Sequence, residues 1–144
     1  MVVIDEAHDI QSHEVFEELR LMLNFQTETR FLLTLLLVGQ PELDSLLEAN
    51  RQFSQRVDLR FHLGPFDLHD TELYIRHRLR VASVEDSVVF PPETIALVHR
   101  HSGGIPRWIN HFCHLSLLSA ASRNIRTVTT DIVTDAIRTA KGSS

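Results

Sequence analysis

The sequence predicts an α/β protein whose second half is entirely helical. Two apolar runs, Met1–Ile4 and Phe31–Val38, each stop at polar residues or glycine, as strands of a parallel sheet do. A third segment, Val57–Leu63, alternates apolar and polar residues, which is typical of a strand with one buried face. After Gly64-Pro65 no strand pattern recurs, and the apolar residues repeat at helical spacing. We therefore expect a three-stranded α/β lobe over 1–63 and a helical lobe over 64–144.

Helical patterns lie between the expected strands of the first lobe. Ser12 is a suitable N-cap, and acidic residues follow it in the early turns, where they suit the helix dipole. Pro41 is suited to open the next helix. Phe31–Val38 is so continuously apolar that we expect it to be covered on both faces, and we expect Met1–Ile4 to be buried. The expected helices are Ser12–Asn24, Pro41–Ala49 and the short turn Arg51–Gln55.

Four helices are expected in the second lobe. Asp67 and Thr130 are suitable caps, Pro92 suits a first turn, and Asn124 suits a helix end. The expected helices are Leu68–Ala82, Pro92–His101, Pro106–Arg123 and Thr130–Ala140.

Composition excludes several classes of protein. The 144 residues are 43% hydrophobic, which excludes a disordered chain, and the formal net charge of -5 argues against a nucleic-acid surface over the whole chain. Cys113 is the only cysteine, which excludes a disulfide scaffold. The nine histidines are accompanied by no HExxH motif, Cys/His pair or acidic residue at ligand spacing, so we expect no histidine metal site. The longest apolar run is far shorter than the roughly 20 residues that cross a bilayer, and the N-terminus lacks the basic region of a signal peptide.

Two polar segments follow the first two expected strands. Asp5-Glu6 ends the first, and Gln40 follows the second after Gly39. Open α/β sheets bind ligands at this edge, and paired acids there can order Mg²⁺ and polarise a water molecule for nucleotide hydrolysis. The alternatives are a solvated acidic turn and a glutamine that simply opens the helix at Pro41.

Arginines mark two further positions. Arg51 and Arg56 bracket a short polar stretch before the third expected strand; each can be solvated, pair with an acid, or reach a phosphate site of a neighbouring subunit. Arg107 lies in the first turn of the helix that begins at Pro106, after Gly103-Gly104. A cation there opposes the helix dipole by up to about 1 kcal/mol, so we expect an anion to compensate.

Taken together, these segments resemble the second half of an AAA+ ATPase module, a P-loop NTPase, and specifically the bacterial general secretion pathway protein A family and its transposition-ATPase relatives. The resemblance runs from Val2 to about Arg138. The motifs that carry it are VVIDEAH, LLLVGQPEL, the run from Gln55 into RFHLGPF, ELYIRHRLRVA and HSGGIPRWIN.

The resemblance implies a role for each singled-out residue. Asp5 would order Mg²⁺ through water in a Walker B strand, and Glu6 would be the catalytic base. Gln40 matches the sensor-1 position, and Arg56 matches an arginine finger that acts on a neighbour's nucleotide. Arg107 matches sensor 2 in a helical lid and would touch the nucleotide of its own subunit. ATP and Mg²⁺ are the implied ligands.

One family motif is missing. No GxxxxGK[ST] phosphate-binding loop occurs, and the only lysine is Lys141. We therefore expect a fragment, inactive alone, of a parent that carries this loop upstream. In the sheet that the chain resembles, a strand from that upstream half would lie between Phe31–Val38 and Val57–Leu63.

The sequence is compatible with three functions. The first is an ATPase module whose parent drives assembly of a secretion or cell-envelope complex, with self-association and a cytoplasmic location; an inner-membrane anchor of the parent stays open. The second is a DNA-binding transposition regulator, which the acidic balance disfavours and the Arg76, Arg78, Arg80 cluster keeps open. The third is a non-catalytic oligomerisation or interaction domain.

Overall fold

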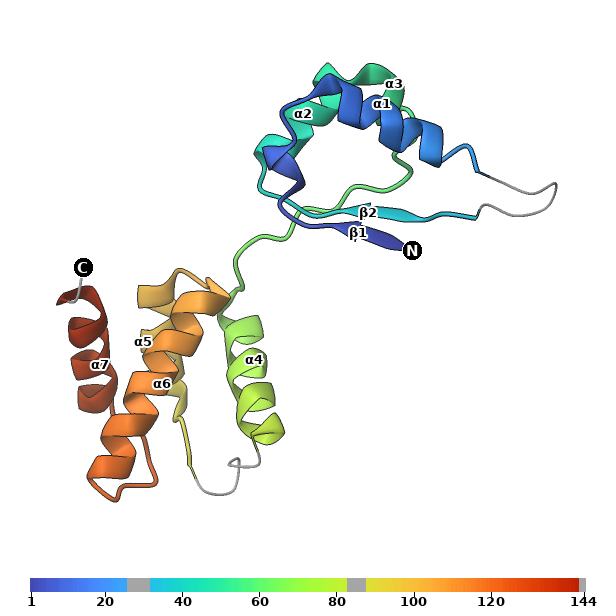
Figure 1. Ribbon diagram of the computed structural model, residues 1–144. Helices are drawn as coiled ribbons and strands as arrows, with labels where there is room; N and C mark the ends of the chain where they lie inside the picture. The colour runs from blue at the N-terminus through green and yellow to red at the C-terminus, as the bar shows by residue number, and fades with distance from the viewer. Residues whose placement is uncertain (26–31, 83–87, 143–144) are drawn as a thin grey trace. The chain divides into compact units, whose positions relative to one another are not determined.

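The computed structural model describes residues 1–25, 32–82 and 88–142. The chain divides into two compact units, Met1–Leu63 and Gly64–Ser144 (Figure 1). The first unit contains a small parallel sheet with helices, and in its described residues the second is helical. The α/β and helical characters expected from the sequence are therefore present.

The sheet of the first unit has two parallel strands, β1 (Val2–Ile4) and β2 (Leu35–Leu37), with Val3 opposite Leu36. Backbone bonds continue the pairing past the strand ends, because the Ala7 N–H donates to the Val38 carbonyl at 2.8 Å. The second strand is shorter than the expected Phe31–Val38, and Phe31 itself lies outside the described residues.

Helices lie over one face of this sheet in Figure 1: α1 (His13–Met22), α2 (Glu42–Ala49), the short α3 (Arg51–Ser54) and a single 3-10 turn, η1 (Ala7–Asp9). Ser12 caps α1 as expected, accepting the Glu14 N–H. Phe16, Leu47 and Phe53 form the buried centre, and Leu35 and Leu37 pack against it. The Phe16 and Phe53 rings meet edge to face at 5.3 Å. This packing fixes the sheet beneath the helices.

The opposite face of the sheet is open, so the expected burial of both strands is wrong. Val3 is 51% exposed and its partner Leu36 is 46% exposed. In a parallel pair, opposite residues share a face, and Leu35 and Leu37 point to the other one. No described segment of the first unit forms a second helical layer over this face. Val3 and Leu36 are therefore exposed to solvent.

The third expected strand, Val57–Leu63, is also not formed. The described residues contain two strands only, and Leu59, Phe61 and Leu63 are 75%, 85% and 94% exposed. Alternating apolar and polar residues suit a segment to a strand. A strand forms only where another backbone pairs with that segment. No described strand pairs with this segment. The side chain of Arg60 instead contacts Ser54 and Asp44.

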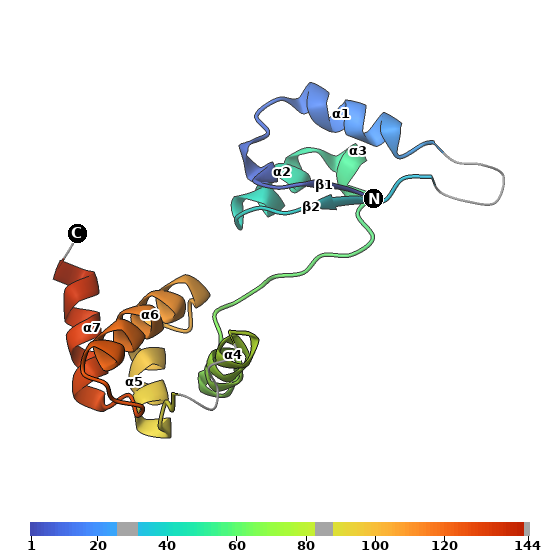
Figure 2. The ribbon, with the colours of Figure 1, turned by 60° about the horizontal axis from the view of Figure 1, so that its bottom comes forward.

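The second unit contains α4 (Leu68–Val81), α5 (Pro92–Ser102), α6 (Pro106–Ser122) and α7 (Thr130–Gly142), each within a few residues of its expected bounds (Figure 2). Asp67 caps α4 by accepting the Asp70 N–H at 2.7 Å. Asn124 takes a left-handed conformation just after α6, as a helix-ending residue does. Thr130 is the first residue of α7 rather than its cap.

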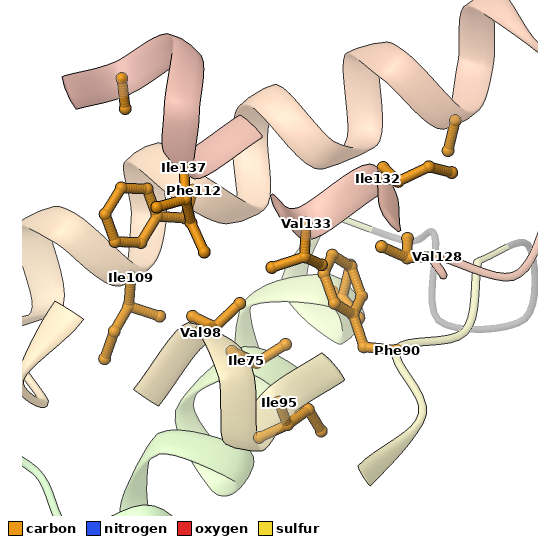
Figure 3. Packing of buried hydrophobic residues seen from close by; sticks show 13 residues of the cluster. Ile75, Phe90, Ile95, Val98, Ile109, Phe112, Val128, Ile132, Val133 and Ile137 are labelled. Carbon is orange, nitrogen blue, oxygen red and sulfur yellow. The ribbon is translucent and has the colours of Figure 1, made fainter. Parts of the chain in front are cut away.

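All four helices contribute to one core, whose centre Figure 3 shows. Phe112 and Val98 are fully buried there, together with Ile132 and Val133 of α7. A single bridge between Val89 and Thr127 ties the segment before α5 to the α6–α7 loop. No helix among the described residues combines the length and apolar character needed to cross a membrane.

Candidate functional site at the end of the parallel strands

The ends of β1 and β2 bring two of the singled-out segments together. The Val38 N–H donates to the Ile4 carbonyl at 2.9 Å, so the turn after β1 and the turn after β2 leave the sheet side by side. Asp5-Glu6 lies in the first turn, and Gln40 lies in the second. All three side chains are exposed at this edge.

Glu6 holds a backbone conformation that is unusual for a residue with a side chain. Its φ is 52°, in the left-handed region, and it precedes η1. The carboxylate of Asp5 stabilises this turn by accepting the Glu6 N–H at 2.9 Å. Such a conformation costs of order 1–2 kcal/mol and persists where the surrounding structure enforces it. The turn therefore fixes the direction in which the Glu6 side chain leaves the sheet.

His8 joins the two turns, and sequence reasoning missed it. Its Nδ1 lies 3.3 Å from the Gln40 backbone nitrogen and 3.5 Å from Oε2 of Glu6. The His8 side chain is 12% exposed, whereas that of Glu6 is 65% exposed. The motif VVIDEAH contains His8 two residues after Glu6, so the residue itself was visible in the sequence. What the sequence did not give was the contact with Gln40, 32 residues away.

Negative charge gathers around this edge. Asp5, Glu6 and Asp9 lie within one turn, and Asp9 Oδ1 is 3.7 Å from His8 Nε2. The described residues hold no group of three or more His, Cys, Asp or Glu side chains arranged to bind a metal. Mg²⁺ keeps several waters and takes one or two carboxylates together with phosphate oxygens, so this donor set fits Mg²⁺ bound with a nucleotide.

Arg56 lies in the same unit as Glu6 but apart from the contacts just described. Its N–H closes the turn after α3 by donating to the Phe53 carbonyl at 2.8 Å, and its side chain is exposed. Within the described part of the chain, the Arg56 guanidinium makes no hydrogen bond or ion pair. The Arg56 guanidinium is therefore an exposed cation of the first unit that pairs with no acidic side chain among the described residues.

Arg107 lies in the second unit, in the first turn of α6. That turn contains no acidic residue, and no side chain caps it. A shallow hollow of ≈ 460 Å³ lies along this helix, lined by Arg107, Trp108, Asn110, His111 and His114. The Trp108 ring stacks on Phe112 at 5.7 Å, and Asn110 is held by Tyr74 of α4. Arg107 makes no ion pair among the described residues.

Arg76 belongs to the arginine cluster of α4 that keeps a DNA-binding function open. Arg76 pairs with Glu72 one turn earlier, at 2.7 Å. This exposed ion pair engages the Arg76 guanidinium within its own helix.

The chain is similar to proteins of known families. Residues 1–47, which contain β1, β2 and the turns after them, match the family model described as AAA domain. General secretion pathway protein A of Aeromonas hydrophila is 41% identical to this chain over 125 residues. The chain belongs to the AAA-type, general secretion pathway protein A-like ATPase family.

The chain spans about a fifth of the length of the relative that it matches. The aligned region is 85% of this chain but 22% of the Aeromonas hydrophila protein. No solved structure matches the chain. The activity, substrates and partners of a whole protein of this family are therefore matters for proposal.

Proposed function

We propose that this chain is the part of an AAA+ ATPase that carries its hydrolytic residues, and that the parent protein hydrolyses ATP to drive assembly of a secretion or cell-envelope complex. The observation that carries the proposal is the pairing of β1 with β2, because it brings the Asp5-Glu6 turn beside the Gln40 turn at the carboxyl edge of a parallel sheet. This is the edge at which such sheets bind nucleotides.

Each residue of this edge receives a chemical role. Asp5, which uses one oxygen on the Glu6 N–H, would hold the water shell of Mg²⁺. Glu6 would accept a proton from the attacking water, and the Gln40 amide would orient that water or the terminal phosphate. Bound Mg²⁺ supplies neutralisation of phosphate charge.

The two arginines would act on phosphate oxygens from different places. Arg56 would reach the nucleotide of a neighbouring subunit, since its guanidinium is exposed and uncommitted. Arg107 would bind a phosphate of its own subunit's nucleotide from a helical lid formed by 64–144. A phosphate would also offset the unfavourable position of this cation in the first turn of α6.

The parent would complete what this chain lacks. It would supply the GxxxxGK[ST] loop and a strand beside β2, onto which Val57–Leu63 would pair as a third strand of this chain. We expect the chain alone not to hydrolyse ATP, because positioned phosphate contacts account for most of catalysis in this class. The parent would self-associate on the cytoplasmic side, where it would meet an envelope partner.

The test is Glu6→Gln in a protein that contains both this chain and the phosphate-binding loop. We expect unchanged ATP binding and hydrolysis reduced at least about 100-fold, because only the base is lost. Gln preserves the size of the side chain. Glu48→Gln, at an exposed residue in the last turn of α2, is the control and should keep full activity. Hydrolysis that survives Glu6→Gln would refute the assignment.

A further inference from the structure

We propose that His8 is a positioning residue that locks the Glu6 turn to the Gln40 turn through one ring nitrogen. This rests on the proposed function, in which these two side chains act on one nucleotide. His8 itself has no role in that proposed function.

The contact geometry defines what the ring does. The Gln40 N–H points at His8 Nδ1, 3.3 Å away, so Nδ1 is the acceptor and carries no proton in this arrangement. The proton of the neutral ring is then on Nε2, on the side of Asp9 Oδ1. Glu6 Oε2 lies 3.5 Å from the same Nδ1, so the ring bounds the space available to the Glu6 carboxylate.

The His8 ring is largely shielded from solvent and lies close to Gly39. Its side chain is 12% exposed although both of its neighbours, Glu6 and Asp9, are largely in solvent. A Cβ at Gly39 would meet the backbone nitrogen and Nδ1 of His8, each at 3.2 Å, and Leu43 Cδ2 at 3.3 Å. Gly39 therefore leaves the room that lets the ring reach the Gln40 N–H.

The Gln40 N–H is bonded to His8 and takes no part in the β1–β2 ladder. The last backbone bond between the two turns is the one from Ala7 to Val38, two residues before Gln40. Beyond it, Gln40 is exposed and its carbonyl is already engaged by the Leu43 N–H at the start of α2. Removing the acceptor at His8 frees the Gln40 N–H without breaking the β1–β2 ladder.

Amide hydrogen exchange of the chain, followed by NMR, tests the bond directly. We expect the Gln40 amide to exchange at least about tenfold faster in His8→Leu, which keeps bulk without an acceptor. His8→Asn places an oxygen close to the position of Nδ1 and should stay within about twofold of the parent chain. The Val38 amide, bonded to Ile4, should be unchanged in both variants.

A second measurement connects the bond to catalysis. In the protein that carries the phosphate-binding loop, His8→Leu should lower kcat about tenfold with KM unchanged, and His8→Asn should restore most of it. An unchanged Gln40 amide in His8→Leu, or equal acceleration of Gln40 and Val38, would overturn the proposal. If Glu6→Gln leaves hydrolysis intact while the exchange result holds, the proposed function fails and the His8 bond stands.

Discussion

At the scale of single residues, Cys113 has a chemical property that its surroundings dictate. It lies on α6, partly buried and packed against the helical core. Burial raises the pKa of the Cys113 thiol from its ordinary value of 9.0 to about 12. The thiol thus stays protonated at neutral pH and is a packing group there rather than a nucleophile.

This shift predicts a loss of stability in alkali. Above pH 9 the unfolded chain releases the thiol proton while the folded chain keeps it, so the free energy of unfolding falls as pH rises toward 12. The part due to Cys113 should reach about 2 kcal/mol at pH 10.5, measured by urea unfolding against pH 8. Cys113→Ala is less stable at both pH values but should lack this part of the fall; equal falls in both proteins would contradict the assignment.

The candidate site shows what residue patterns could and could not predict. The sequence singles out Asp5 and Glu6 because two acids end an apolar β-branched run, and it singles out Gln40 because this residue follows another such run. It does not single out His8, since the role of His8 depends on a contact between turns 32 residues apart. A local pattern gives the side chain, whereas only the strand register places it beside its partner.

At the scale of elements, the four helices of the second unit were predictable because each carries its own signals. Asp67, Pro92 and Asn124 mark boundaries by local backbone chemistry, which tertiary contacts need not supply. Val57–Leu63 was mispredicted because a strand has no such independence. Its alternating residues are present, but the pairing backbone must come from elsewhere.

The turn between α5 and α6 depends on one of its two glycines far more than on the other. A Cβ at Gly104 would clash with the carbonyl oxygen of Phe66. The backbone N–H of Phe66 donates to the Gly104 carbonyl at 2.9 Å. A Cβ at Gly103 would meet nothing within 4 Å. Both residues have positive φ, of 74° and 60°. The pair therefore separates backbone strain from steric exclusion.

We expect Gly103→Ala to cost about 1 kcal/mol, which is the strain of a left-handed alanine. Gly104→Ala should cost at least about 3 kcal/mol, because the strain adds to displacement of the segment before α4. Urea unfolding of the two variants beside the parent chain measures the difference. Equal costs would show that Phe66 does not hold this turn in solution.

At the scale of the whole molecule, the proposed trans role of Arg56 predicts complementation between subunits. Arg56→Ala should impair hydrolysis in assemblies of the loop-bearing protein but leave ATP binding by the monomer intact, because its target lies across an interface. A subunit with Arg56→Ala keeps Glu6, and a subunit with Glu6→Gln keeps Arg56. Mixing the two should restore part of the ATPase rate; no restoration at any ratio would refute the trans role.

Unpaired sheet edges and an exposed apolar face favour self-association of the isolated chain. β1 and β2 each have an outer edge that no described strand pairs, and Val3 and Leu36 leave one sheet face apolar and open. The unpaired Val57–Leu63 segment carries the alternation of a strand. One chain thus holds both an open sheet edge and a segment suited to pair with one, which favours edge pairing or exchange of this segment between copies.

We therefore expect self-association at micromolar concentration, measured by light scattering, with the helical unit folded normally. Phe61→Asp should weaken it, because a buried carboxylate opposes the apolar face that Phe61 would present in a strand. Leu118 is exposed on α6, and Leu118→Asp is the matched control, which should leave self-association unchanged. A strict monomer whose β1 and β2 amides all resist hydrogen exchange would mean that the sheet closes within one chain, because only a paired edge protects its outward amides.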